Sequence, residues 1–195
     1  MERYPGYICV GKSKIKVNTD FRYAIKALTV ECSSTIGILE QVSIVTGINL
    51  HGRLRWWKFR YKKFLKIAIN NPEELAEAFI DYMCCGRGRK KTSQNKIIDY
   101  DIDYPLIYSA FLHDYGIDLN KEKMHWWRFC DLFNGLHQDN QICQAIMYRS
   151  ADLSKVKDKE QRKHIAEMKK VYAIEQEDNR MTLLEMQEYI KSLGK

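Results

Sequence analysis

The sequence predicts a mainly α-helical protein, a helical bundle-like domain with a small N-terminal β-hairpin. Apolar residues recur at helical spacing through most of the chain, and hydrophobic residues make up 45% of it, enough to build a core. Strand-like alternation is confined to the start. The 195 residues suit one domain. We expect that domain to span 1–174 and to be followed by an acidic C-terminal helix or appendage at 175–195.

The β-hairpin is expected within residues 1–17. The stretch "YICVGKSKIKV" has β-prone runs on both sides of a turn-like Gly-Lys-Ser break. In "NTDFRYAIKAL", which follows, Thr19 or Asp20 can cap a helix whose apolar residues recur at i, i+3, i+4 and i+7. The order is therefore a hairpin and then a helix.

The next helices are predicted through "TIGILEQVSIV" and over residues 54–68. The clearest start signal is "NPEE", which places Asn71 at the N-cap, Pro72 at the first helical position and Glu74 as the capping-box partner, with Gly86 as the stop. Residues 86–96, "GRGRKKTSQNK", lack apolar side chains. We therefore expect a mobile basic surface loop there.

Beyond the loop, Asp103 can cap a helix that has Pro105 in its first turn and ends at Gly116. Asp99 and Asp101 alternate with Asp103, and we interpret the three as solvated acids plus a helix cap. They lack the turn glycine and terminal glutamate of a calcium loop. Further helices are predicted over 121–136, 141–148 and 156–173, and a second capping box, "TLLE", opens a terminal helix at 182–185.

Charge is distributed in blocks. The net charge is +7, yet residues 53–96 hold twelve Lys or Arg and four acids, whereas 99–122 hold six acids and one Lys. Residues 175–188 hold five acids and one Arg. Such alternation suits self-association or protein partners at least as well as nucleic acid. No stretch is apolar enough for a membrane helix or a signal peptide, so we expect a cytoplasmic protein without a membrane partner.

Two adjacent tryptophan pairs occur, "RWWKF" at 55–59 and "HWWRF" at 125–129. Helical phase places Trp57 on the first apolar stripe and Trp126 on the second, so the pairs are out of register by one residue and are not an inherited repeat. Trp56 and Trp127 fall off the stripes. Each needs a second surface, which is either a neighbouring helix or a partner.

Catalytic and metal motifs are missing from the sequence. There is no G-x-S-x-G, P-loop or H-E-x-x-H, and the six cysteines lack C-x-x-C spacing, so we expect no enzyme, no cofactor, no metal and reduced core thiols. The basic aromatic segment 53–66 and the loop 86–96 form the best nucleic-acid candidate, although no known binding motif surrounds them. Its contacting residues would be Arg87, Arg89, Lys90 and Lys91.

Two stretches carry a family resemblance. "YPLIYSAFLHDYGIDLNKEKMHWWRFCDLFNGL" and "IMYRSADLSKVKDKEQRKHIAEMKKVYAI" closely resemble the bacteriophage gene-product-fifteen family of tailed phages and prophages of Gram-positive bacteria. "NTDFR" and "FIDYMCCGRGR" resemble it more loosely. The basic middle and the acidic segment after Glu175 depart from the family pattern.

The resemblance implies a tail assembly chaperone, encoded near the tape-measure gene and generally absent from the finished virion. We expect a non-catalytic protein that binds the tape-measure protein in the host cytoplasm during assembly, with the tail-tube protein, a companion tail chaperone and a second copy of the chain as further candidate partners. The contacting residues we expect are Trp127, Trp56, Arg128, Arg53 and Arg60. The alternatives are a structural tail component of the virion and the nucleic-acid-binding module.

Overall fold

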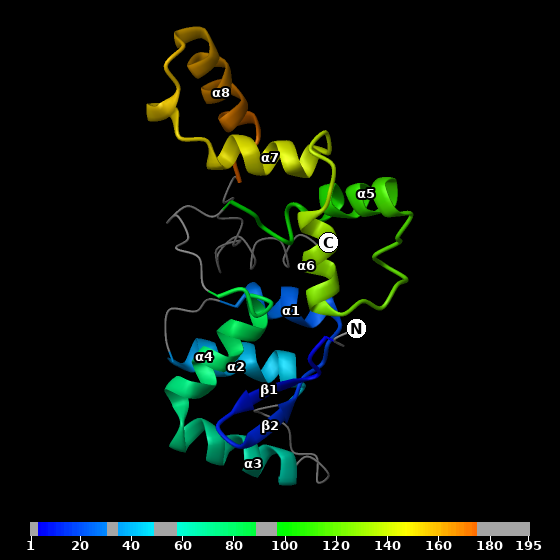
Figure 1. The fold of residues 1–195 in the computed structure, drawn as a ribbon, viewed down its shortest axis with the longest axis vertical. Helices are drawn as coiled ribbons and strands as arrows, with labels where there is room; N and C mark the ends of the chain where they lie inside the picture. The colour runs from blue at the N-terminus through cyan, green and yellow to red at the C-terminus, as the bar shows by residue number, and fades with distance from the viewer. Residues whose placement is uncertain (1–3, 31–34, 49–57, 89–96, 175–195) are drawn as a thin grey trace, which may run out of the picture.

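The computed structural model describes residues 4–30, 35–48, 58–88 and 97–174. Within these ranges helices dominate, and a single two-stranded antiparallel sheet lies near the N-terminus (Figure 1). The predicted fold class is confirmed. The loop residues 89–96, the first tryptophan pair and the predicted terminal helix lie outside the described residues. No helix in the described part of the chain is long and apolar enough to cross a membrane.

The hairpin forms where the alternation predicted it. Strand β1, Tyr7–Val10, pairs antiparallel with β2, Ser13–Lys16, and Val10 lies opposite Ser13 across the turn. Because side chains alternate along a strand, Ile8 and Ile15 share the buried face. The hairpin therefore presents one apolar side to the helices.

Helix α1, Phe21–Leu28, packs on α2, Thr35–Thr46. Asp20 is the N-cap of α1, and its carboxylate accepts the backbone N–H of Arg22 at 3.0 Å, which confirms one of the two predicted caps. Small residues on the inner face of α1 let α2 approach closely. The almost fully buried residues of the two helices include Ala24, Ala27, Val42 and Val45.

Helices α3, Lys58–Asn70, and α4, Pro72–Met83, follow directly on each other. Pro72 opens α4 as predicted, but the capping box does not form, because the Asn71 side chain makes no cap hydrogen bond. The Glu74 carboxylate accepts the side-chain amide of Asn71 and the backbone N–H of Gly11 instead. Glu74 thus ties the start of α4 to the hairpin turn.

Helix α5, Tyr104–Tyr115, has Asp103 at its N-cap and ends at Gly116, whose φ is 66°, as predicted. The expectation that Asp103 is a solvated capping acid is wrong. Its side chain is 1% exposed, makes no cap hydrogen bond and pairs with Arg149. A carboxylate removed from water needs a charged partner, and here a distant helix supplies it.

Helix α6, Trp126–Asn134, begins five residues later than the predicted start at Lys121. The chain before it is extended and pairs with the start of α1: Phe21 donates its N–H to Met124 O at 2.9 Å, and Trp126 donates to Thr19 O at 2.7 Å. His125 caps α6 by accepting the N–H of Trp127. Tertiary pairing therefore overrides the helical pattern over residues 121–125.

Phe129 of α6 connects the core around α1 with the core around α5. Its ring is stacked between Phe21 of α1, with centroids 4.7 Å apart, and Phe111 of α5, at 5.0 Å. All three side chains are almost fully buried. The core thus continues from the hairpin and α1 up to α5.

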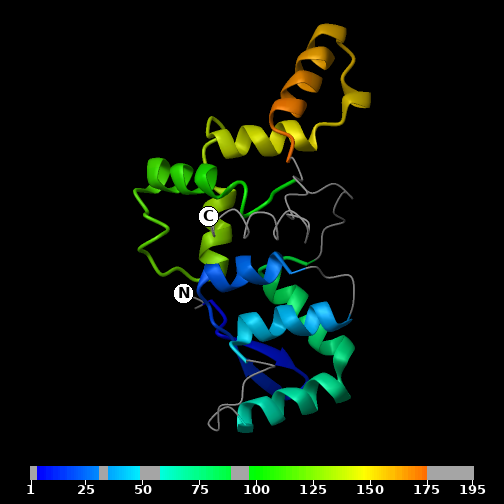
Figure 2. The same ribbon diagram turned by 180° about the vertical axis from the view of Figure 1, so that it is seen from behind.

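Helix α7, Gln141–Ser150, the short 3-10 helix η2, Leu153–Lys155, and α8, Lys159–Val171, complete the described chain. We call these three elements the arm. Figures 1 and 2 show the arm at one end of the long axis, with α7 beside α5, and the hairpin and α3 at the other end. Helix α8 starts later than the predicted 156, because Asp158 caps it.

Candidate interaction surface

The end of α4 is built by two consecutive left-handed residues. Cys85 has φ 58° and Gly86 has φ 67°, and their N–H groups donate to Tyr82 O at 3.1 Å and Asp81 O at 2.9 Å. This is the Schellman pattern of a helix C-terminus. Gly86 was predicted as the stop, but the first left-handed position belongs to Cys85.

The "WW" pair of α6 closes this helix end. The indole Nε1–H of Trp126 donates to Met83 O at 3.1 Å, and that of Trp127 donates to Tyr82 O at 2.9 Å. Carbonyls in the last turn of a helix have no partner within the helix and must find one outside it. Trp126 supplies a donor for Met83 O, and Trp127 adds a second donor to Tyr82 O, which also accepts from Cys85, so the pair joins α6 to α4.

Trp126 and Trp127 otherwise differ as helical phase predicted. Trp126 is 3% exposed and belongs to the core, whereas Trp127 is half-buried and packs at the core's edge. A Cβ placed on Gly86 would lie 3.2 Å from Cη2 of Trp127, so the ring covers the turn closely. Of the two surfaces foreseen for Trp127, the structure provides the neighbouring helix.

The other residues expected to make contacts are spread over the chain. Arg128 is exposed on α6, and exposed Arg87 forms an ion pair with Asp131, which leaves it less available for a phosphate. Arg60 lies in α3, although its side chain is not among those described. The rest of the expected set lies outside the described residues: Arg53, Trp56, Arg89, Lys90 and Lys91.

Asp131 also binds the N-terminal part of the chain. It accepts a hydrogen bond from the Tyr4 hydroxyl at 3.0 Å, and the same carboxylate raises the pKa of Tyr4. Trp127, Arg87 and Tyr4 thus gather around the first turns of α6: Arg87 and Tyr4 both bond to the Asp131 carboxylate, and Trp127 donates to Tyr82 O.

The five cysteines in the described part of the chain are free thiols. Cys85 is buried at the end of α4, and its side chain forms a hydrogen bond with Cys130 of α6. That bond lowers the pKa of Cys85 and raises the pKa of Cys130. No group of three or more His, Cys, Asp or Glu in the described residues is arranged to hold a metal ion.

Arg149 at the end of α7 fixes the arm to the rest of the protein. Its guanidinium pairs with both carboxylate oxygens of Asp103, at 2.7 and 2.9 Å, and also donates to Ile97 O at 3.1 Å. Its Nε donates to Tyr172 O just beyond α8. The pair is enclosed, with exposed fractions of 9% for Arg149 and 1% for Asp103. One side chain therefore holds α5, α7 and the end of α8 together.

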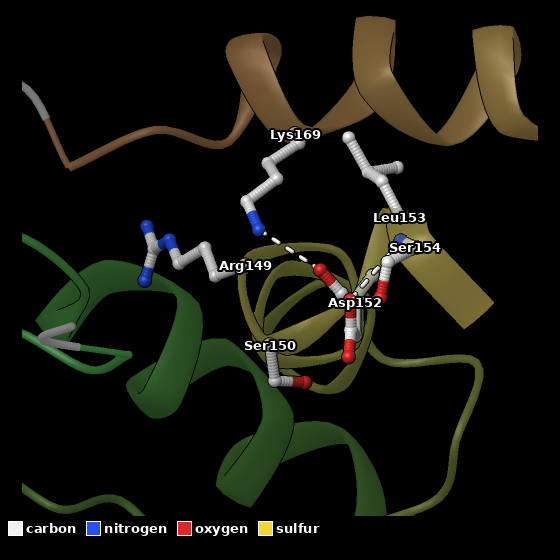
Figure 3. Close-up of a pocket in the computed structure, with 7 residues that line it drawn as sticks. Arg149, Ser150, Asp152, Leu153, Ser154 and Lys169 are labelled. Atoms are coloured by element: carbon white, nitrogen blue, oxygen red, sulfur yellow. Dashed lines mark hydrogen bonds between the residues drawn. The ribbon is translucent and has the colours of Figure 1, made fainter. Parts of the chain in front are cut away.

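A cavity of about 380 Å³ opens within the arm (Figure 3). On its α8 side Lys169 reaches across and donates to Ala151 O at 2.9 Å, and on its floor Asp152 accepts from Ser154. Its lining consists of Arg149, Ser150, Ala151, Asp152, Leu153, Ser154 and Lys169. Lys169, Asp152 and Ser154 bond within the arm and Arg149 pairs with Asp103 outside it, so the charged groups of the lining already have partners.

Helix α8 is incompletely covered. It packs on α7 and η2, and none of its side chains is buried. Val171 is 72% exposed, while Ile165 and Met168 are half-buried. On α7, Met147 is 53% exposed. Polar contacts and the stacked Tyr148 and Tyr172 rings, 5.7 Å apart, hold α8 in place, which leaves apolar side chains available to a partner.

Comparison with known proteins identifies the region that contains these features. Residues 73–174, just over half of the chain, match the family described as Bacteriophage Gp15 protein. The chain belongs to the bacteriophage Gp15 protein family. The predicted resemblance is thus confirmed. No curated protein and no solved structure matches the chain.

The Gp15 region contains most of α4, the two tryptophans at its end, the Arg149–Asp103 pair and the whole arm. Sequence reasoning did not foresee the arm as a surface. The available signal was the apolar stripe of 156–173, which is narrow and lies in a strongly charged segment. A helix with such a narrow apolar stripe buries one face at most and leaves the rest of its surface exposed.

Proposed function

We propose that this Gp15 protein is a non-catalytic tail assembly chaperone that binds the tape-measure protein of its phage while the tail is built. Membership of the Gp15 family supports a role in phage structure or assembly. The finer role is our inference. It follows from the arm, which lies inside the family region and leaves apolar side chains uncovered.

The arm suits a long helical partner better than the tryptophan pair does. The indole N–H of Trp127 donates to Tyr82 O at the end of α4, and its ring packs over the turn at Gly86. Helix α8 instead offers an amphipathic face beside a cavity, and amphipathic partners bind such faces through apolar residues spaced three or four apart. We therefore move the proposed contact from Trp127 and Arg128 to the arm, centred on Val171 and Met168.

The basic side chains of α8 would set the orientation of the partner. Five Lys or Arg against two Glu within Lys159–Val171 give this helix a net positive charge. Complementary charges steer encounter and register more than they add affinity. A negatively charged stretch of the tape-measure protein is the segment expected to bind.

The test is capture of the tape-measure protein encoded with this chain, after co-expression of the two full-length proteins. Val171→Asp places a charge on the exposed apolar position and should abolish most capture. Gln138→Asp adds the same charge at an exposed site between α6 and α7 and should leave capture unchanged. Equal capture by both variants would show that the arm does not contact the tape-measure protein. Absence of capture by the unmodified chain would refute the proposed role.

A further inference from the structure

His125 contacts three parts of the chain at the start of α6. Its Nδ1 accepts the backbone N–H of Trp127 at 3.0 Å, which caps the helix, and its Nε2 lies 3.0 Å from Pro5 O. Its imidazole is stacked on the Tyr4 ring, with centroids 5.0 Å apart, and its backbone forms a β-bridge with Asp20 just before α1. His125 therefore connects the N-terminal segment, the entry to α1 and α6.

The two hydrogen bonds of the imidazole require one protonation state. A backbone N–H only donates, so Nδ1 must carry no proton, and a backbone carbonyl only accepts, so Nε2 must carry one. The neutral ring protonated at Nε2 satisfies both bonds. The imidazolium has a proton on each nitrogen, so its Nδ1–H would point at the N–H of Trp127.

We propose that His125 is a pH-sensitive switch, whose neutral ring holds Tyr4 and Pro5 on α6 and whose protonation breaks the helix cap and releases them. The proposal goes beyond the proposed function and does not depend on it, because every contact of His125 lies within this chain and outside the arm.

The position of His125 disfavours its charged form. It is the N-cap of α6, where the helix dipole and the free N–H groups of the first turn repel a cation. Burial acts in the same direction and lowers the pKa of His125 below its ordinary value of 6.5, although the bond to Pro5 O opposes this. Once charged, the ring must turn Nδ1 away from the helix. This rotation moves Nε2 off Pro5 O and the ring face off Tyr4.

The carboxylates near the ring already have cationic partners. Asp20, across the β-bridge, pairs with Arg22 at 2.8 Å. Asp131, in the next turns of α6, pairs with Arg87 and also accepts the Tyr4 hydroxyl. Neither carboxylate is thus free to stabilise the imidazolium.

The other titratable groups around the ring do not compensate either. Tyr82 of α4 lies edge-on to His125, with centroids 6.4 Å apart, and burial raises the pKa of its phenol. The bond to Asp131 raises the pKa of Tyr4, so both phenols stay neutral as the pH falls. The cation of Arg128 is near Tyr4 and lowers the pKa of that phenol, so it also opposes a charge on His125.

The direction of the pKa shift sets the pH range of the switch. Because the folded pKa of His125 lies below 6.5, the unfolded chain takes up a proton first as the pH falls. The contacts of the neutral ring are therefore complete above about pH 6.5 and are lost as the pH falls through the folded value.

Long-range proton–nitrogen NMR of the full chain, labelled with nitrogen-15 at histidine, tests this directly. The spectrum distinguishes a ring protonated at Nε2 from one protonated at Nδ1 and follows each ring as it takes up a second proton. We expect neutral His125 to be protonated at Nε2 and to titrate below pH 6.5, with the Tyr4 ring signals moving to solvated values at the same midpoint. A neutral ring protonated at Nδ1, a midpoint at or above 6.5, or unchanged Tyr4 signals would each overturn the proposal.

Amide exchange of Trp127 measures the cap itself. Loss of a side-chain cap weakens a helix start by about five-fold, so the protection factor of this amide should fall about five-fold as His125 becomes charged. His125→Asn keeps an oxygen that can cap the helix and removes the titration, so protection should no longer depend on pH. His164→Asn changes an exposed histidine of α8 and should preserve the fall. Constant protection in the unmodified chain, or the same fall in His125→Asn, would contradict the switch.

Discussion

Trp126 shows how a single side chain serves the core and a helix end at once. Its ring is buried against Phe129, with centroids 5.7 Å apart, while its Nε1–H satisfies Met83 O. Trp126→Ala should therefore cost on the order of 3–5 kcal/mol of unfolding free energy. Trp126→Phe keeps an aromatic ring and loses the donor, so it should cost about 1–3 kcal/mol. Urea unfolding of both variants measures the two contributions, and equal losses would show that the hydrogen bond matters as much as the ring.

Gly86 and Gly88 provide a matched pair at the same scale. Both have positive φ, 67° and 71°, so alanine at either should cost about 1–2 kcal/mol from the backbone alone. At Gly86 the new Cβ would also meet the Trp127 ring at 3.2 Å, whereas at Gly88 it meets nothing within 4 Å. Gly86→Ala should lower the urea midpoint more than Gly88→Ala. The reverse order would mean that Trp127 does not cover this turn in solution.

Asp114 at the end of α5 should make the fold sensitive to acid. The backbone N–H of His137 and the His113 side chain hold the pKa of its carboxyl well below the ordinary value of 3.8. Since the folded pKa is the lower one, the stabilisation is complete above about pH 4 and is lost as the pH falls towards the folded value. Between pH 5 and pH 2 the urea midpoint should fall less steeply for Asp114→Asn than for the unmodified chain, with Asp139→Asn as an exposed control. Parallel profiles for all three would contradict this role.

At the scale of elements, most helices could be predicted from local signals and their junctions could not. Asp20, Pro72 and Gly116 mark helix ends through their own side chains or backbone preferences, and these ends are where the sequence placed them. The start of α6 depends on pairing with Thr19 and Phe21, more than a hundred residues away. The burial of Asp103 could not be predicted, because its partner Arg149 lies 46 residues further along the chain.

The Arg149–Asp103 pair joins the arm to α5 and should couple their stabilities. Arg149→Met would leave Asp103 buried without its cation, so it should cost about 3–5 kcal/mol. Replacing both residues, Asp103→Leu with Arg149→Met, removes the unpaired charge and should cost less than the sum of the single changes. A double-mutant cycle by urea unfolding measures this coupling. Additive losses would mean that the two side chains act independently.

At the scale of the whole molecule, the described part of the chain comprises a helical base and a less enclosed arm. The base is held by the Phe21–Phe129–Phe111 stack and the tryptophans that close α4. The arm depends on Arg149 and on a few polar contacts. The sequence indicated the base, because long apolar stripes predict burial. It could not indicate the arm, because which side of a stripe remains uncovered is decided by elements elsewhere in the chain.

The double tryptophan illustrates the same limit. Phase along the helix separated a core Trp126 from a Trp127 that needs a second surface, and that separation is confirmed. Sequence alone favoured packing within the chain and left a partner as the alternative. The hydrogen bond from Trp127 to Tyr82 O at the end of α4 shows that the second surface is a neighbouring helix. This bond could not be predicted without knowing that α4 and α6 lie side by side.

An assembly chaperone and a structural tail component differ most in where the protein is found after assembly. The decisive measurement is therefore the amount of this chain, relative to the major tail protein, in purified phage particles and in the lysate from which they came. A chaperone should be present in the lysate and reach only a small fraction of stoichiometric amounts in the particles. A fixed, stoichiometric number of copies in each particle would contradict the proposed function.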